Sequence, residues 1–152
     1  MSVCTFLAAD TPLPAVQPKQ DYPIVINIDD GIIFDGGADD NFFLHPFPDV
    51  QTYTDRSYGV WLDWQYTPGR ARQIIEYIRH ALQYSASIDF WHIWLLGYWE
   101  YEERPVIHRR RIALADLTVD DIHTLDTSPI WNAPDKHYPD RPSFYCITVT
   151  RS

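Results

Sequence analysis

The chain has 152 residues, a mass of 17.8 kDa and a formal net charge of -9 at pH 7. That length is typical of a single domain with one hydrophobic core, so we expect residues 1–152 to form one domain. Hydrophobic residues make up 45% of the chain and aromatic residues 15%, which excludes an intrinsically disordered protein. Twelve basic against twenty-one acidic residues disfavour a nucleic-acid partner, because binding a phosphate backbone requires cations.

The N-terminus gives no sign of export. Residues 1–9 lack the basic segment and the long apolar run of a signal peptide. The longest apolar stretch, residues 90–98, is interrupted by His92 and is too short to span a membrane. We therefore expect a cytoplasmic protein without membrane contact, in which Cys4 and Cys146 are buried thiols. The two thiols would be neighbours only if the strands at the two chain ends pair.

The N-terminal part of the chain predicts strands and one hairpin. Residues 2–7 have the composition of a strand, and so do residues 24–28 and 32–34. The Asp-Gly pair at residues 30–31 supplies the positive φ angle that a tight turn needs. We therefore expect the second and third strands to form a β-hairpin.

A glycine-containing loop follows the hairpin and concentrates oxygen ligands. Its candidate metal-binding residues are Asp35, Asp39, Asp40, Asn41 and His45. Carboxylates at this density suit a hard cation such as calcium or magnesium, but their spacing does not match an EF-hand loop. The favoured alternative is a solvated turn in which the Asp and Asn side chains bond to their own backbone. We expect neither a metal nor another cofactor.

The remainder of the chain alternates strands and helices, beginning with a predicted strand at residues 58–64. Thr67 then offers a helix cap, with Pro68 at the first helical position. The helix is indicated by apolar residues at helical spacing, namely Ala71, Ile74, Ile75, Ile78 and Leu82. Residues 88–96 are rich in β-branched and aromatic residues and predict a strand that is apolar on both faces.

The C-terminal part predicts two more strands around a second helix. Residues 106–114 predict the first of these strands, and residues 144–150 predict the last. Between them, Thr118 and Asp121 form an approximate capping box, which marks the start of a short helix.

This order of elements is that of the ferredoxin-like split βαβ arrangement, an α+β fold. We expect residues 57–152 to form this core, an antiparallel sheet with both helices on one face. Residues 1–56 would then be an N-terminal extension of strands and a hairpin, whose strands, together with residues 42–47, would cover part of the open face. One observation counts against the arrangement. The strand at 106–114 would be central, yet its three arginines at 109–111 need solvent or partners.

Negative charge is concentrated in one segment of the chain. Residues 21–66 contain nine aspartates and a single basic residue, Arg56. Two interpretations of this asymmetry stay open. The acidic segment either neutralises the arginines at 109–111 within the chain, or it remains exposed and attracts a basic partner.

A candidate ligand site would form on the open sheet face if the strand registers bring five side chains together. These are Trp61, Asp63, His92, His108 and Arg110. An arginine and two histidines beside an aromatic ring suit a small anionic or planar ligand, and a histidine can move protons near neutral pH. A slip of one residue would exchange the faces, and the alternative for His92 is a hydrogen-bonded core residue. No motif supports nucleophilic catalysis.

A candidate interaction surface is indicated by aromatic and acidic residues in loops. The chain has six tryptophans and ten tyrosines, residue types that are enriched at protein interfaces. Residues 131–139 have neither a helical nor a strand pattern, and a long irregular loop is often functional. We expect this surface to include Asp39, Asp40, Trp131 and Tyr138, although aromatic residues there also suit the packing of proline-rich loops.

The opening residues 1–8 (MSVCTFLA), residues 39–43 (DDNFF) and residues 141–146 (RPSFYC) together resemble a family of small bacterial proteins of uncharacterised function. The resemblance implies a bacterial origin and a cytoplasmic location. It implies no activity, cofactor or catalytic residue.

The absence of a catalytic motif and the acidic bias of residues 21–66 predict a small non-catalytic protein that binds a protein partner with a basic surface. The alternative is a small-molecule-binding domain or an enzyme that uses the sheet face with His92 and Arg110. A less favoured alternative is a DNA mimic, in which carboxylates imitate phosphates. An apolar sheet face left uncovered would favour a homodimer.

Overall fold

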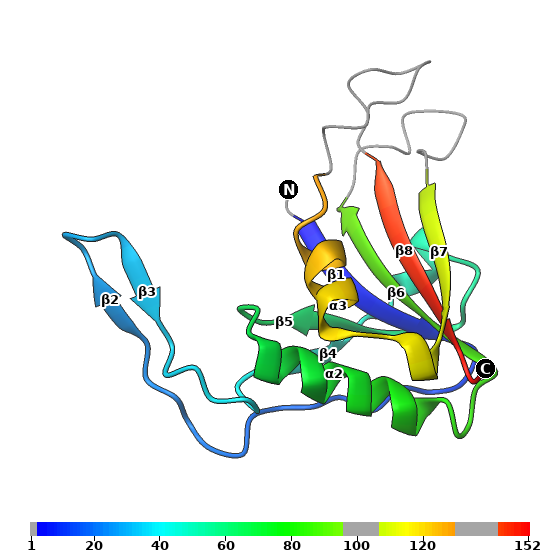
Figure 1. Ribbon diagram of the computed structural model, residues 1–152, viewed down its shortest axis with the longest axis horizontal. Coiled ribbons are helices and arrows are strands. Elements are labelled where there is room, and N and C mark those ends of the chain that lie inside the picture. Colours follow the sequence, from blue (N-terminus) through cyan, green and yellow to red (C-terminus); the bar gives the residue numbers. More distant parts are fainter. Residues whose placement is uncertain (1–2, 96–106, 130–142) are drawn as a thin grey trace.

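A computed structural model describes residues 3–95, 107–129 and 143–152, and shows a mixed α+β fold (Figure 1). Its strands are β1 (Val3–Ala9), β2 (Val25–Asn27), β3 (Ile32–Phe34), β4 (Phe43–Pro46), β5 (Tyr58–Asp63), β6 (Ser87–Trp94), β7 (Ile107–Ala113) and β8 (Phe144–Thr150). Its helices are α1 (Val50–Tyr53), α2 (Pro68–Ala81) and α3 (Val119–Asp126), with a 3-10 turn η2 (Leu114–Asp116) after β7. Within these residues, no helix has the length and apolar character needed to cross a membrane.

Six of the strands form one sheet in the order β4-β5-β1-β6-β8-β7. All neighbours are antiparallel except β7 and β8, which are parallel and are joined through α3. Because β5 and β6 both run antiparallel to β1, they are parallel to each other, with α2 as their crossover. The sheet therefore contains one βαβ unit split by β1 and a second βαβ unit whose strands are direct neighbours.

This order does not confirm the ferredoxin-like arrangement, and it corrects the expected place of the N-terminal strand. β1 is not part of an extension but lies in the middle of the sheet, between β5 and β6. Four consecutive residues of β1, at positions 6–9, are completely buried. A strand that is apolar on both faces needs cover on both sides, which only a central position provides.

The two long helices begin where the sequence predicts them. The Thr67 hydroxyl accepts a hydrogen bond from the backbone N–H of Arg70 at 3.1 Å, which caps α2. In α3, the Thr118 hydroxyl accepts from the Asp121 N–H at 3.2 Å, and the Asp121 carboxylate accepts from the Thr118 N–H at 2.9 Å. The predicted capping box is therefore confirmed, with Asp in the position that Glu more often occupies.

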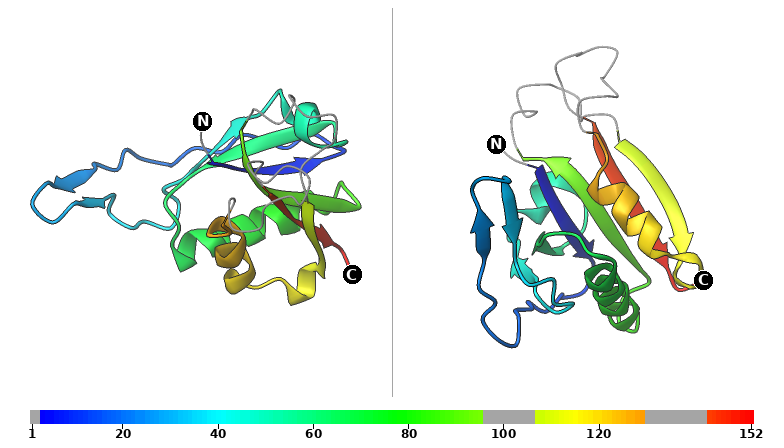
Figure 2. Two further views of the ribbon diagram at one scale, coloured as in Figure 1. Left: turned by 90° about the horizontal axis from the view of Figure 1, so that it is seen from above. Right: turned by 60° about the vertical axis from the view of Figure 1, so that its left-hand side comes forward.

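The sheet separates two apolar clusters of buried residues, and Figure 2 shows α2 and α3 together on one of its faces. α2 and α3 cover one face and bury residues such as Ile74, Phe90 and Ile122. The other face is covered by α1 and packs Phe6 and Trp91 in a second cluster. The segment at 42–47, expected to lie over the open face, instead supplies the edge strand β4, and only its last residue, at position 47, packs against the second cluster.

The arginine strand β7 lies at the edge of the sheet and not at its centre. Side chains at an edge reach solvent around the rim of the sheet, which resolves the conflict raised by three consecutive arginines. The Arg109 and Arg110 side chains are both about half exposed, and the nearest acids to them are Asp89 and Asp121.

The predicted hairpin is confirmed and forms an arm that projects from the body of the protein (Figure 1). Gly31 provides the turn with a φ of 65°. The arm, which we define as residues 24–34, carries large apolar side chains that are more than half exposed, namely Ile24, Val25, Ile26, Ile28 and Phe34. Val25 and Ile26 are neighbours in one strand and point to opposite faces. Both faces of β2 are therefore open to solvent.

Candidate functional site

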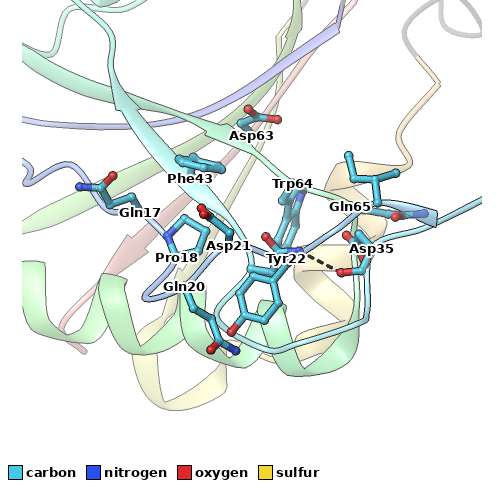
Figure 3. Close-up of a pocket in the computed structure, with 12 residues that line it drawn as sticks. Gln17, Pro18, Gln20, Asp21, Tyr22, Asp35, Phe43, Asp63, Trp64 and Gln65 are labelled. Atoms are coloured by element: carbon cyan, nitrogen blue, oxygen red, sulfur yellow. Dashed lines mark hydrogen bonds between the residues drawn. The ribbon is translucent and has the colours of Figure 1, made fainter. Parts of the chain in front are cut away.

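A pocket of about 590 Å³ lies at the base of the arm (Figure 3). We call it the acidic pocket. One wall comes from residues 17–24, which lead into the arm, and the other from β4 and the end of β5. Three aromatic rings line it, those of Tyr22, Phe43 and Trp64.

Hydrogen bonds hold the walls of the acidic pocket in place. Val16 and Leu44 exchange backbone hydrogen bonds of 3.0 and 2.9 Å, which fix the start of residues 17–24 against β4. The Tyr22 hydroxyl donates to Asp40 at 2.5 Å, and the Trp64 indole N–H donates to Asp126 at 3.1 Å. Because the polar tips of both rings are bonded elsewhere, their apolar surfaces are positioned before any ligand binds.

One acid of the pocket, Asp35, is neutralised inside the chain. Arg70 is completely buried and donates to both carboxylate oxygens of Asp35, at 2.8 and 3.0 Å. It also donates to the carbonyls of Ala38 and Gln65, so its guanidinium ties the loop after the arm to the start of α2. The hydrogen bond from Arg70 lowers the pKa of Asp35. The periodicity of α2 gave no sign that this arginine would be buried.

Two other acids of the pocket keep their charge available. Asp21 is exposed and forms no ion pair with any described residue. Asp63 is 56% exposed, and the Nε2 of His45 lies 3.4 Å from its carboxylate. The pocket thus combines aromatic walls with a negative electrostatic potential.

Most aspartates of the wider acidic segment, residues 21–66, form no ion pair with another described residue. Arg109 and Arg110 lie beside Asp89 and Asp121, which are both outside residues 21–66. Within the described residues, six aspartates of the segment form no ion pair: Asp21, Asp29, Asp30, Asp39, Asp40 and Asp49. Of the two interpretations of the charge asymmetry, the structure therefore disfavours neutralisation of the arginine strand.

The candidate metal-binding residues of the loop contact other parts of the protein and do not converge on one point. Asp35 binds Arg70, Asp40 accepts from Tyr22, and His45 lies against Asp63. The Asp39 carboxylate fills the space where a Cβ at position 69 would lie, against the first turn of α2, where negative charge is favourable. Across the described ranges, no three His, Cys, Asp or Glu side chains are arranged to hold a metal.

The five residues of the predicted ligand site lie on opposite faces of the sheet. Val60 and Leu62 belong to the cluster under α2 and α3, so the alternating residues Trp61 and Asp63 face the other way. Trp61 stacks on His45 with ring centroids 4.4 Å apart. The expected convergence is therefore wrong for these two residues.

The other three residues of that site lie on the helix-covered face. His92 is buried and shares a hydrogen bond of 3.1 Å with Thr5 through Nδ1. Burial lowers the pKa of His92, as expected for an uncharged core residue. His108 stacks on Tyr145 at 4.8 Å, and Arg110 donates to Asp121 at 3.3 Å.

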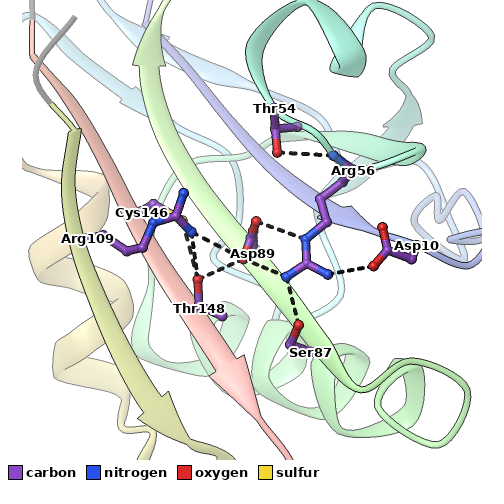
Figure 4. Close-up of polar contacts among 8 residues, drawn as sticks. All are labelled: Asp10, Thr54, Arg56, Ser87, Asp89, Arg109, Cys146 and Thr148. Carbon is purple, nitrogen blue, oxygen red and sulfur yellow. Dashed lines mark hydrogen bonds and ion pairs between the residues drawn. The ribbon is translucent and has the colours of Figure 1, made fainter. Parts of the chain in front are cut away.

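A second polar cluster lies on the face of the sheet away from α2 and α3 (Figure 4). Asp89 on β6 is only 2% exposed. It accepts from Arg56 Nε at 3.1 Å and Nη2 at 3.2 Å, and from the Thr148 hydroxyl at 2.8 Å. Arg56 extends the cluster to Ser87 at 2.7 Å and to Asp10 at 3.0 Å. We call this set the Asp89 cluster; it joins the loop after α1 to the central strands.

Arg109 closes the Asp89 cluster from the edge strand. Its Nη1 donates to Thr148 at 3.0 Å and lies 3.8 Å from Asp89, while its guanidinium sits over the Trp91 ring, 5.2 Å from the ring centroid. This arginine covers Cys146, and burial raises the pKa of that thiol to about 12. The pKa of Cys4 is raised to about 12 for the same reason.

The two cysteines are not adjacent through strand pairing. β6 lies between the strands that carry them, with Cys4 opposite Ile93 and Cys146 opposite Trp91. Both thiols are buried, as predicted.

Of the predicted interaction surface, Asp39 and Asp40 lie beside the acidic pocket, whereas Trp131 and Tyr138 fall outside the described residues. The chain matches no protein-family model, no curated protein and no solved structure.

Proposed function

We propose that the protein is a non-catalytic binding protein that recognises a partner with a basic surface. The observation that carries the proposal is the position of the unpaired aspartates around the exposed arm. Asp29 and Asp30 lie at its tip, while Asp21, Asp39 and Asp40 lie near its base. Apolar side chains flanked by carboxylates that form no ion pair with a described residue match a basic surface that contains an apolar groove.

The exposed arm supports binding because it contributes little to the fold of the free protein. β2 and β3 pair with each other and with no other described strand. An isolated two-stranded hairpin is marginally stable in water. A partner that covers both faces of the arm would bury its five large apolar side chains, and the hydrophobic gain grows with the area removed from water.

The negative charge supports the same proposal through the rate of association. Carboxylates that form no ion pair with a described residue add to the negative electrostatic potential around the arm, and such potentials steer an oppositely charged partner. A narrower form of the proposal is a DNA mimic, in which the partner is a nucleic-acid-binding protein. Competition by duplex DNA for the bound partner would distinguish this form.

The test is affinity capture with the full chain from a native lysate, comparing wild type with Asp29→Lys/Asp30→Lys. The control is Asp116→Lys, which introduces positive charge at an exposed position after β7. We expect wild type and control to retain the same basic protein at low salt, and the arm variant to lose it. High salt should release the partner, because exposed charges are screened.

Two results would contradict the proposal. One is that the protein retains no partner at low salt. The other is that the arm variant, shown by circular dichroism to be folded, retains the same partner as the wild-type protein does.

A further inference from the structure

We propose that the acidic pocket binds the guanidinium group of an arginine side chain presented by the partner. This inference rests on the proposed function for the existence of a partner, but its ligand is deduced from the pocket itself. The pocket would give the partner a second contact next to the arm. The two surfaces are continuous, because Ile24 belongs to the arm and also lines the pocket.

The aromatic walls favour a flat cation. Tyr22, Phe43 and Trp64 come from three segments that are far apart in sequence, and all three line the same hollow (Figure 3). Tyr22 and Trp64 are anchored by the hydrogen bonds to Asp40 and Asp126, and the Phe43 ring is stacked on His45 with centroids 5.1 Å apart. A guanidinium group is planar and weakly hydrated, so it stacks on aromatic rings better than an ammonium group does.

The carboxylates supply the second half of the recognition. Asp21 and Asp63 lie in the two opposite walls of the pocket, one before the arm and one at the end of β5. Asp35 is not available, because Arg70 already occupies both of its oxygens. A guanidinium has N–H donors around its edge, so it can be stacked on a ring and hydrogen-bonded to carboxylates at the same time.

The size and the donor set argue against other ligands. A volume of about 590 Å³ lies in the usual range of small-ligand sites and exceeds that of a bare ion. Among the described residues, no three acidic or histidine side chains converge as a metal would require. The remaining polar lining includes the amides of Gln17, Gln20 and Gln65, whose carbonyl oxygens accept hydrogen bonds from a guanidinium.

The test uses small probes and the full chain. N-acetyl-arginine methylamide is titrated while the Trp64 indole signal is followed by NMR, with the citrulline compound as a neutral probe of the same shape and the lysine compound as an ammonium probe. We expect the citrulline compound to bind about tenfold more weakly and the lysine compound to lie between them.

A pair of matched variants tests the location. Asp21→Asn/Asp63→Asn removes the two pocket carboxylates, and Asp29→Asn/Asp116→Asn removes the same charge elsewhere. We expect the first variant to bind the arginine probe about fivefold more weakly than the second. Equal affinities for the arginine and citrulline probes, equal affinities of the two variants, or no saturable shift of the Trp64 signal would overturn the inference.

The same variants separate this inference from the proposed function. If the partner is retained by Asp21→Asn/Asp63→Asn as it is by wild type, but lost by Asp29→Lys/Asp30→Lys, the pocket does not bind the partner and the proposed function stands. If all of the variants retain the partner, the proposed function fails as well.

Discussion

The Asp89 cluster and the acidic pocket are both built from carboxylates, yet they differ in where the opposing charge comes from. In the Asp89 cluster, Arg56 and Arg109 approach one buried carboxylate from two sides. In the acidic pocket, Asp21 forms no ion pair with a described residue, and Asp63 has the His45 ring nearby, at 3.4 Å. Charge that is matched within the chain holds the fold together, whereas charge without an internal ion pair, as at Asp21, is what we propose that a partner binds.

Breaking the Asp89 cluster should give the largest effect on stability. Asp89→Ala leaves Arg56 and Thr148 without their buried acceptor, and removing one partner of a buried pair costs about 3 kcal/mol or more. Urea denaturation should show this loss in the free energy of unfolding. The matched variant is Asp10→Ala, because Asp10 is 66% exposed and touches the same Arg56.

We expect Asp10→Ala to cost less than about 1 kcal/mol, the usual value of an exposed ion pair. A similar loss for both variants would mean that burial does not decide the strength of these contacts, and the comparison would fail.

Local signals allowed much of the secondary structure to be predicted. Thr67 and Pro68 marked the start of α2, the Thr118 capping box marked α3, and the Asp-Gly pair marked the turn of the arm. Each of these signals acts within four residues, so a single sequence displays it. The last strand, β8, also has its predicted bounds.

Strand order and the acidic pocket were not predictable in the same way, because they depend on contacts between distant segments. β1 pairs with β5 and β6, and even its nearest partner in sequence, Tyr58 opposite Ala9, lies far along the chain. No local motif specifies this pairing. The apolar composition of residues 6–9 is consistent with their burial, but it does not identify the partner strands. The pocket likewise assembles rings from positions 22, 43 and 64. Trp61 and His92 do not meet because they lie on opposite faces of the sheet. The face on which a side chain lies cannot be predicted without the register of its strand.

Removing the Asp35 carboxylate should have the second-largest effect. Asp35→Asn leaves the buried Arg70 without its anionic partner, at a cost of about 2 kcal/mol at pH 7. The pKa of Asp35 is lowered in the folded protein, so the folded state holds fewer protons than the unfolded state as the pH falls through about 4. The stabilisation by Asp35 is therefore present above that pH and is lost below it.

The measurement is urea denaturation of wild type and Asp35→Asn at pH 7 and at pH 3. The difference in free energy of unfolding between the two proteins should shrink at the lower pH. A difference that is the same at both pH values would show that the ionised carboxylate is not what stabilises the loop.

Polar substitution on the arm should have the smallest effect on the free energy of unfolding. Ile28 is 87% exposed and Ile26 is 64% exposed, so Ile26→Ser/Ile28→Ser removes little buried surface. We expect the free energy of unfolding to change by less than about 0.5 kcal/mol, whereas truncation of the buried Ile74 to Ala should cost about 3 kcal/mol. Partner capture, by contrast, should be lost with Ile26→Ser/Ile28→Ser, since the apolar side chains of the arm are the proposed contact. A marked loss of stability in Ile26→Ser/Ile28→Ser would mean that the arm serves the fold of the free protein, and its exposed residues would no longer indicate a binding surface.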